Sequence, residues 1–178
     1  MTEETLTTAE PFTDAATCLE EWFCVLGPLT GFPCTDHPSG ILPFSERLPE
    51  IDLLLARTAA TRQAGTVVAV LDALDTLGLD LLDRLLTLAL LRTSMDSRLR
   101  QGLRFRELCE AVGAAEWRDQ EDLRKRLEEK GALRHLSLLQ SDDDTLEAER
   151  LYRLSPVWKS PILAGRTDNG ATIGAARI

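Results

Sequence analysis

The sequence predicts a mainly helical protein of the α+β class, a winged helix-turn-helix with an N-terminal helical extension. Only 5% of the residues are aromatic, so the core has to consist mainly of leucine, alanine and valine, a composition that favours helices. Apolar residues recur at helical spacing in several successive segments. Two short segments, 103–105 and 151–154, instead have the patterns of strands.

Length and charge limit the classes of function. The chain has 178 residues and a formal net charge of −9, which fits one domain with additions rather than two full domains. An acidic chain has no overall attraction to DNA or to anionic membranes, so nucleic-acid binding would need a local basic patch. The most apolar run, 79–91, contains charged residues and is shorter than the ~18 residues of a membrane span. The N-terminus lacks the basic start of a secretory signal, and we expect a cytoplasmic protein.

The first part of the chain predicts a tail followed by a helical extension. Residues 1–13 show no period and are expected to form a flexible tail. Residues 14–78 form the extension, which includes a loop rich in proline and glycine at 27–44. Pro49 is expected in the first turn of a helix. Three helices are predicted in the extension, at residues 14–26, 45–64 and 66–77. A glycine directly follows each of them.

Residues 79–163 form the predicted winged-helix domain. Asp80 is a suitable N-cap for a leucine-rich helix that ends near Leu91. A short strand at 103–105 is followed by a second helix at 106–112. The third helix spans about 116–130, and its inward-facing residues are expected to be Trp117, Gln120, Leu123 and Leu127. The three tryptophans, Trp22, Trp117 and Trp158, are all assigned to the core.

The predicted wing follows the third helix. It consists of an apolar run at 133–139, an acidic turn at 141–144 and a second run at 151–154. A short helix starts at Ser155-Pro156, and residues 164–178 are expected to be a flexible tail. Helix, strand, helix, helix and a two-stranded wing is the order of a winged helix. The alternative is a plain small helical domain with an incidental hairpin.

The charges of the third helix and the wing argue against DNA reading. Two pairs four residues apart, Glu121 with Lys125 and Asp122 with Arg126, would each stabilise an exposed helix by about 0.2–0.5 kcal/mol. A helix face that neutralises itself has little charge left to release counterions from DNA. The wing carries acids where many DNA binders carry bases, opposed only by Arg150; these acids are Asp142, Asp143, Asp144, Glu147 and Glu149.

One group of arginines favours DNA instead. It lies between the first and second helices of the domain, against the single acid Asp96, and comprises Arg92, Arg98, Arg100, Arg104 and Arg106. These side chains could contact phosphates, although such contacts alone would not specify a sequence. A solvated linker and an acid-binding protein surface are the other interpretations. The candidate partner- or nucleic-acid-binding residues are Arg98, Arg100, Arg104, Arg106 and Arg118.

The sequence shows no convincing active site, and we expect a protein that is not an enzyme and has no cofactor. No lysine follows a glycine as a phosphate-binding loop requires. Four potential zinc ligands occur without the spacing of a common zinc motif, and the cysteines among them fit equally well as small hydrophobic residues; the four are Cys18, Cys24, Cys34 and His37. His135 lies in an apolar run and is expected to be half-buried rather than a partner for a cysteine nucleophile.

The segments LRFRELCEAVGAAEWRDQEDLRKRLEEKGALRHLSLL and RLYRLSPVWKSPILAG resemble the N-terminal winged-helix region of a group of bacterial AAA+ ATPases. The resemblance covers about residues 79–165. It implies a non-catalytic part that docks a substrate, an adaptor or the ATPase ring. No ATPase core follows Gly165, so the resemblance implies either a fragment of a larger protein or a free-standing relative. No catalytic residue can be transferred, because the family's motifs lie in the ATPase core.

These observations predict a protein-interaction module that is an adaptor or regulatory part of an AAA+ system. The expected partner is another protein or an AAA+ core, with no membrane. The alternative is a DNA-binding transcriptional regulator that uses the arginines between the first two helices of the domain.

Overall fold

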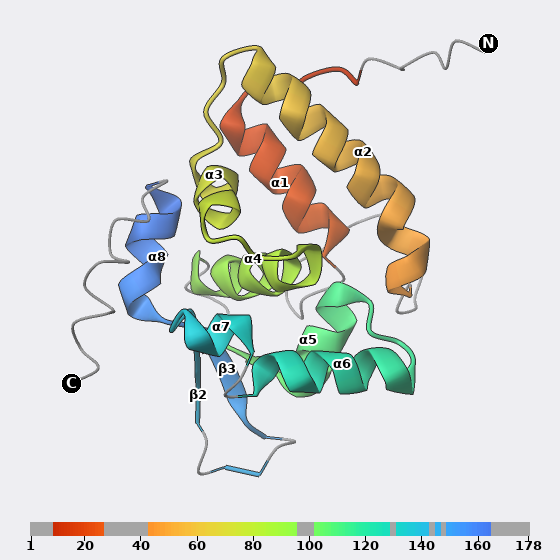
Figure 1. Ribbon diagram of the computed structural model, residues 1–178, viewed down its shortest axis with the longest axis vertical. Helices are drawn as coiled ribbons and strands as arrows, with labels where there is room; N and C mark the ends of the chain where they lie inside the picture. Colours follow the sequence, from red (N-terminus) through yellow and green to blue (C-terminus); the bar gives the residue numbers. More distant parts are fainter. Residues whose placement is uncertain are drawn as a thin grey trace.

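The structure is a computed structural model that describes residues 9–26, 43–95, 102–128, 131–142, 145–146 and 149–164. It is mainly helical with a small three-stranded sheet (Figure 1). The elements are α1 (Ala15–Val25), α2 (Phe44–Gln63), α3 (Ala69–Thr76), α4 (Leu81–Met95), β1 (Leu103–Arg104), α5 (Phe105–Val112), α6 (Trp117–Leu127), α7 (Ala132–His135), β2 (Leu139–Ser141), β3 (Leu151–Leu154) and α8 (Pro156–Leu163). The loop predicted at 27–44 and the tail predicted at 164–178 lie almost entirely outside the described residues.

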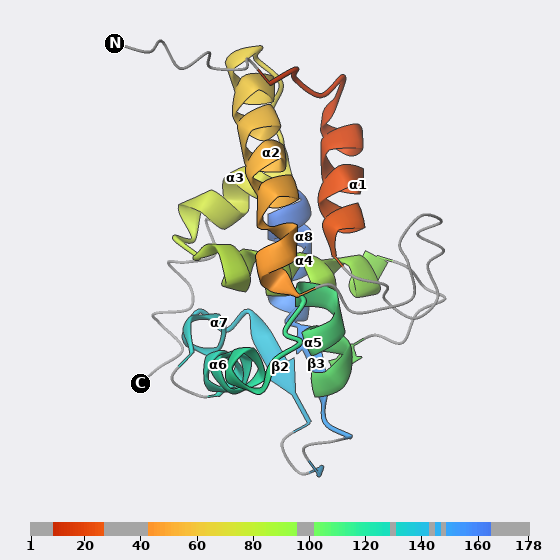
Figure 2. The same ribbon diagram turned by 90° about the vertical axis from the view of Figure 1, so that its right-hand side faces the viewer.

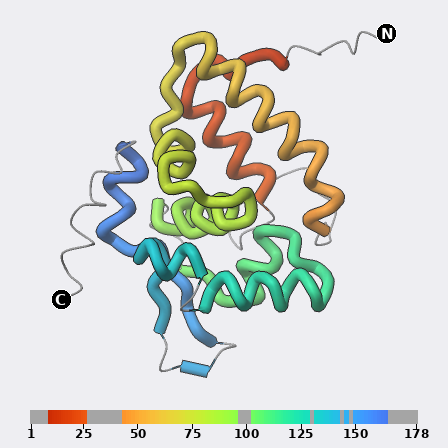
Figure 3. Tube along the Cα trace, in the orientation of Figure 1, coloured from red at the N-terminus to blue at the C-terminus, as the bar shows by residue number. Residues whose placement is uncertain are grey.

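Helix α4 crosses the middle of the molecule, with α1 and α2 on one side and α5, α6 and the sheet on the other (Figures 1 and 2). Its leucines are buried on more than one face, as the broad apolar surface predicted. It contacts α1, α5 and β3. The tube in Figure 3 shows the extension and the C-terminal half packed around this one helix, and a single core contains buried residues from Phe12 to Ile162. The segments 14–78 and 79–163 therefore share a core.

The sheet is antiparallel, with strand order β1-β3-β2. Leu103 of β1 pairs with Tyr152, and Leu139 of β2 pairs with Leu154. Tyr152 and Leu154 alternate along β3 with the exposed Arg153, so one face of the strand is turned to the core. The strands predicted at 103–105 and 151–154 are confirmed, except that Phe105 begins α5.

The apolar run at 133–139 was predicted to be a single strand, and this prediction is wrong. The chain instead forms the short helix α7, which is followed by β2. Gly131 allows the chain to turn from α6 into α7, because a Cβ at this position would lie 1.8 Å from the carbonyl oxygen of Arg126. Ser137 then adopts a φ of 55°, which ends the helical turn. The periodicity of a short apolar run fits a helix and a strand equally well. The backbone conformations at Gly131 and Ser137, on either side of α7, distinguish the two here.

The helices of the extension match the predicted segments, with differences at their ends. Asp14 caps α1 by accepting a hydrogen bond from the backbone N–H of Thr17 at 2.8 Å. Pro49 lies inside α2 rather than in its first turn. Helix α3 starts only at Ala69, which leaves Val67 exposed instead of on the predicted apolar face.

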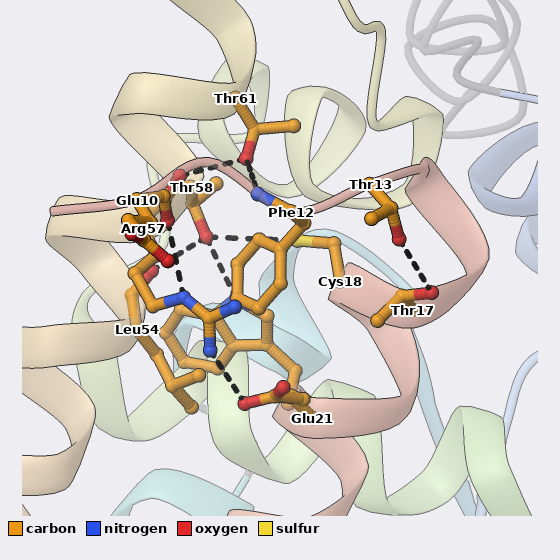
Figure 4. A network of polar contacts seen from close by, with 11 residues as sticks. Glu10, Phe12, Thr13, Thr17, Cys18, Glu21, Leu54, Arg57, Thr58 and Thr61 are labelled. Carbon is orange, nitrogen blue, oxygen red and sulfur yellow. Dashed lines mark hydrogen bonds and ion pairs between the residues drawn. The ribbon is translucent and has the colours of Figure 1, made fainter.

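The chain is packed before α1 begins, whereas the sequence predicted a tail as far as residue 13. The Phe12 side chain is buried, and its N–H donates to Thr61 Oγ1 at 2.8 Å (Figure 4). The Arg57 guanidinium lies 4.0 Å from the centre of the Phe12 ring and pairs with Glu21 at 3.0 Å. The ring contact and the ion pair come from the same guanidinium, so they hold this segment and α1 against α2.

A buried set of polar contacts also joins α1 to α2. Trp22 Nε1 donates to Thr58 Oγ1 at 3.0 Å, and the Thr58 hydroxyl donates to the Leu54 carbonyl at 2.7 Å. Cys18 Sγ lies 3.7 Å from the same hydroxyl (Figure 4). Because these groups satisfy one another, they explain the packing of the two helices and leave no polar group directed at a ligand.

Two arginines bind the C-terminal end of α1. Arg92 of α4 donates to the Phe23 carbonyl at 2.7 Å, and Arg47 of α2 donates to the Val25 carbonyl at 3.2 Å. Arg47 also donates to the carbonyls of Ala111 at 2.7 Å and Glu110 at 3.2 Å, at the end of α5. Both arginines are buried, with 6% of each residue exposed. Carbonyls in the last turn of a helix lack partners and carry partial negative charge, so they suit a buried cation.

The described part of the chain contains no helix that is long and apolar enough to cross a membrane.

The contacts of Arg47 predict a large effect of its removal. Replacing Arg47 with methionine is expected to lower the free energy of unfolding by about 2–4 kcal/mol, because buried carbonyls at the ends of two helices lose their donor. The matched control is Arg106→Met, whose side chain is 89% exposed and whose removal should cost less than about 0.5 kcal/mol. Urea unfolding of both variants measures the difference, and equal losses would show that Arg47 does not hold the helices together.

Candidate interaction surface

Helix α6 occupies the position of the predicted third helix, and its basic side chains are mostly bound within the protein. Arg124 pairs with Glu121 at 3.2 Å, and its guanidinium lies 4.7 Å from the centre of the Phe105 ring. Lys125 pairs with Asp122 at 3.6 Å, with both side chains more than half exposed. The predicted neutralisation therefore occurs through pairs three residues apart. The particular pairs predicted, Glu121 with Lys125 and Asp122 with Arg126, are wrong.

Arg126 binds α4 instead of a residue of its own helix. Its Nη1 lies 2.5 Å from Asp80 Oδ2 and 3.2 Å from Asp83 Oδ1. Asp80 is also the predicted N-cap of α4, since it accepts a hydrogen bond from the backbone N–H of Asp83 at 2.9 Å. The ion pairs therefore attach the C-terminal half of α6 to the N-terminus of α4.

The two carboxyl groups bound by Arg126 have opposite pKa shifts. Burial raises the pKa of Asp83, the neighbouring Asp80 raises it further, and Arg126 opposes both effects. Burial also acts to raise the pKa of Asp80, but hydrogen bonds from the Asp83 backbone and from Arg126 leave this pKa below its usual value. Arg126 is therefore the cation that favours the charged form of the buried Asp83.

The N-terminal end of α6 differs from the rest of the helix. Arg118 is exposed, and among the described residues it has no ion pair or hydrogen bond. Trp117 is 75% exposed, so its assignment to the core is wrong. At 100° per residue, Trp117 lies about 120° around the helix from the buried Leu123. Trp22 and Trp158 are buried, as predicted.

Of the predicted arginine group, the structure describes Arg92, Arg104 and Arg106. Arg98 and Arg100 lie outside the described residues. Arg92 is buried against the end of α1, which removes it from the group. The remaining candidates are exposed: Arg104 ends β1 directly before α5, Arg106 lies in the first turn of α5, and Arg118 lies in the first turn of α6.

The exposed candidates differ in how they are held. Arg106 pairs with Glu110, one turn later on α5, at 3.0 Å. The backbone N–H of Arg104 donates to the Glu107 carboxylate at 2.6 Å, which satisfies a donor at the start of this helix. Both arginines thus begin α5 next to acidic side chains of the same helix.

In the described part of the wing, one predicted acid is paired, whereas Glu149 is exposed. Asp142, at the end of β2, pairs with Arg153 of β3 at 3.0 Å. Arg153 was not counted among the bases opposing the acidic turn. Leu146, between the strands, is 79% exposed. Asp143, Asp144 and Glu147 lie outside the described residues.

The residues considered for zinc are only partly described, because Cys34 and His37 lie outside the described ranges. Cys18 is buried, and burial is the main reason why its pKa is raised. Cys24 is exposed on the same helix. Within the described ranges, no group of three or more histidine, cysteine, aspartate or glutamate residues is arranged to hold a metal ion.

Cys109 and His135 were the other residues considered for catalysis. Burial raises the pKa of Cys109 to about 11, which disfavours a thiolate nucleophile. His135 is exposed in α7 rather than half-buried in a strand, so the prediction for this residue is wrong.

Comparison of the chain with protein-family models, curated proteins and solved structures finds no match. Its function has to be inferred from its own residues.

The ion pairs of Arg126 predict a pH-dependent loss of stability. Replacing Arg126 with methionine is expected to lower the free energy of unfolding by about 2 kcal/mol at neutral pH, because Asp83 stays buried without its cation. The variant raises the folded-state pKa of Asp83 further above its unfolded value, so stability falls as pH rises through that pKa. In the unaltered protein, Asp80, whose pKa is lowered, adds to the free energy of unfolding at neutral pH. This stabilisation is lost in acid, when the carboxylate is protonated.

The loss caused by Arg126→Met should therefore be smaller near the unperturbed carboxyl pKa of about 3.9 than at neutral pH. Adding Asp83→Asn to the variant should restore part of the stability at neutral pH, since a neutral amide needs no cation. Urea unfolding of both proteins at the two pH values measures these effects. A loss that is the same at both pH values would contradict the assignment.

Proposed function

We propose that residues 79–163 are a winged helix that serves as a non-catalytic protein-docking module. The order α4, β1, α5, α6, β2, β3 and the antiparallel arrangement β1-β3-β2 support this interpretation. Helix α7 is an addition between the third helix and the wing. The extension, α1 to α3, is a packing layer on the side of α4 away from the sheet (Figure 1).

The observation that carries the proposal is that three of the four basic side chains of α6 pair with acids of the protein itself. In a DNA-binding winged helix the third helix enters the major groove and requires cations free to meet phosphates. Here Arg124, Lys125 and Arg126 each pair with a carboxylate of the same chain. If Arg126 left its carboxylates to contact DNA, Asp83 would stay buried without its cation. A protein partner does not require this exchange.

The exposed end of α6 has the composition of a protein-binding position. Trp117 exposes most of its indole next to the exposed Arg118. Tryptophan and arginine are enriched among the residues that carry most of the binding energy of protein interfaces. We therefore place the main contact with the partner at this end of α6.

The link to AAA+ ATPases is part of the same proposal. The segment 150–165, which carries part of the resemblance, forms β3 and then α8, which starts with Pro156 in its first turn. We propose that the module is an adaptor or regulatory part of an AAA+ system and that its partner is the ATPase core or a protein delivered to it.

DNA binding is the second candidate, favoured by the exposure of Arg106, Arg118 and the start of α5. Anisotropy of a labelled random duplex at about 50 mM and about 200 mM salt tests it. The docking proposal predicts at most non-specific binding, with a Kd of about 10⁻⁴–10⁻⁶ M. Tight binding that falls steeply with salt, and that is weakened by Arg104→Ala with Arg106→Ala and Arg118→Ala, would overturn the proposal.

The position of the contact can be tested by site-specific cross-linking. A photoreactive phenylalanine analogue placed at Trp117 is expected to give discrete adducts with a protein of the source cells, because this side chain lies in the proposed interface. The matched control carries the analogue at Val67, which is 69% exposed between α2 and α3. Adducts at both positions, or at neither, would contradict docking through the end of α6.

A further inference from the structure

An open groove of about 380 Å³ lies where α2, α4, α5 and α6 meet. Its apolar wall is formed by Phe44, Leu81, Leu82, Val112 and Ala114. Its polar rim consists of Asp80, Asp119, Asp122 and Arg126. The rim thus has three carboxylates against one guanidinium, and that guanidinium already binds Asp80 and the buried Asp83.

The apolar wall is held in place by backbone contacts. The N–H of Phe44 donates to the Gly113 carbonyl at 2.8 Å, which fixes the start of α2 against the end of α5. Gly113 ends α5 with a φ of 78°, a conformation that favours glycine. Leu81 and Leu82 form the first turn of α4, directly after the Asp80 cap, and both are partly exposed. Apolar surface therefore remains open in a groove that requires no rearrangement to form.

The acids of α6 are available to a ligand. Asp119 and Asp122 are three residues apart and so lie on one face of the helix. Asp119 has no ion pair or hydrogen bond with another described residue. Asp122 pairs only with Lys125, at 3.6 Å and with both side chains more than half exposed, an arrangement that contributes little to stability. An incoming cation can therefore meet both carboxylates.

The negative charge of the rim determines which kind of ligand the groove can bind. The whole chain has a formal net charge of −9, so a second copy would bring more negative charge to an acidic rim. An acidic or neutral peptide would leave Asp119 without a partner and Asp122 with only its weak pair to Lys125. A segment with an apolar side chain and a neighbouring lysine or arginine matches both parts of the groove.

We propose that this groove binds a basic amphipathic peptide segment of a partner protein. An apolar side chain of the segment rests against Phe44, Leu81, Leu82 and Val112, and a lysine or arginine binds Asp119 and Asp122. This inference rests on the proposed protein-docking function and adds the chemistry of the partner. The groove lies on the flank of α6 that contains Asp119 and Asp122, away from Trp117, so the two contacts are separable.

The test uses short synthetic peptides and the backbone amide NMR spectrum of the full chain. One peptide combines leucine with lysine, the second leucine with glutamate, and the third serine with lysine. Only the leucine–lysine peptide is expected to shift the amide signals of Leu81, Leu82, Val112 and Ala114 in a saturable way. Equal shifts from the leucine–glutamate peptide, or shifts spread over the acidic surface without saturation at the groove, would overturn the proposal.

Charge-reversal variants separate the groove from the overall negative charge. Asp119→Lys with Asp122→Lys should weaken binding of the leucine–lysine peptide at least about tenfold, the effect of losing direct charge pairs. The matched control, Glu20→Lys with Asp52→Lys, changes the net charge equally at exposed positions of α1 and α2 and should weaken binding by no more than about twofold. Thermal unfolding checks that both variants are folded, and equal weakening by both would overturn the proposal.

The remaining outcomes are distinct. Sedimentation that shows a dimer broken by Asp119→Lys with Asp122→Lys would assign the groove to a second copy and overturn the proposal. If the peptides do not bind but cross-linking at position 117 still gives adducts, the groove proposal fails and the docking function stands. If the groove binds the leucine–lysine peptide but duplex DNA also binds tightly, the proposed function fails by itself.

Discussion

The buried guanidinium of Arg47 connects the two halves of the molecule. It donates only to backbone carbonyls, at the ends of α1 and α5, and its burial lowers its pKa. Helix α1 has no base in its own last turn, so Arg47 and Arg92 supply the positive charge from α2 and α4. The neighbouring bond from Phe44 to Gly113 places α2 beside α5. The position of α1 on α4 and one wall of the groove both depend on these contacts.

Charge within α6 has a structural use that also limits what the helix can bind. Arg126 fastens α6 to the start of α4, and Arg124 packs on Phe105 while it pairs with Glu121. A phosphate backbone would have to compete with carboxylates that are already in place and, for Asp83, buried. Two acids of α6 that face the groove, Asp119 and Asp122, have no internal partner of comparable strength. The same helix is therefore poorly suited to a polyanion and well suited to a cationic side chain.

Much of the fold could be predicted because its signals are local. Helical spacing identified α1, α2, α5 and α6 within a few residues, and Asp80 was recognisable as a cap. Strand β3 followed from its apolar pattern. Periodicity did not predict the structure correctly where the pattern was short or incomplete. The run at 133–139 divides into α7 and β2. Trp117 lies too far around α6 from Leu123 to reach the core. The buried Phe12 had no periodic neighbours to reveal it.

The sequence alone determined that the protein is mainly helical, that Asp80 caps the leucine-rich helix, and that the third helix carries nearly balanced charge. These properties depend on residues within one or two turns of each other. Tertiary structure alone decided which charges meet. Arg126 pairs with Asp80, 46 residues away, and Arg47 binds carbonyls up to 64 residues away. The groove also combines residues from four helices. Such contacts depend on how the helices pack around α4, because packing brings together side chains whose spacing along the chain has no period.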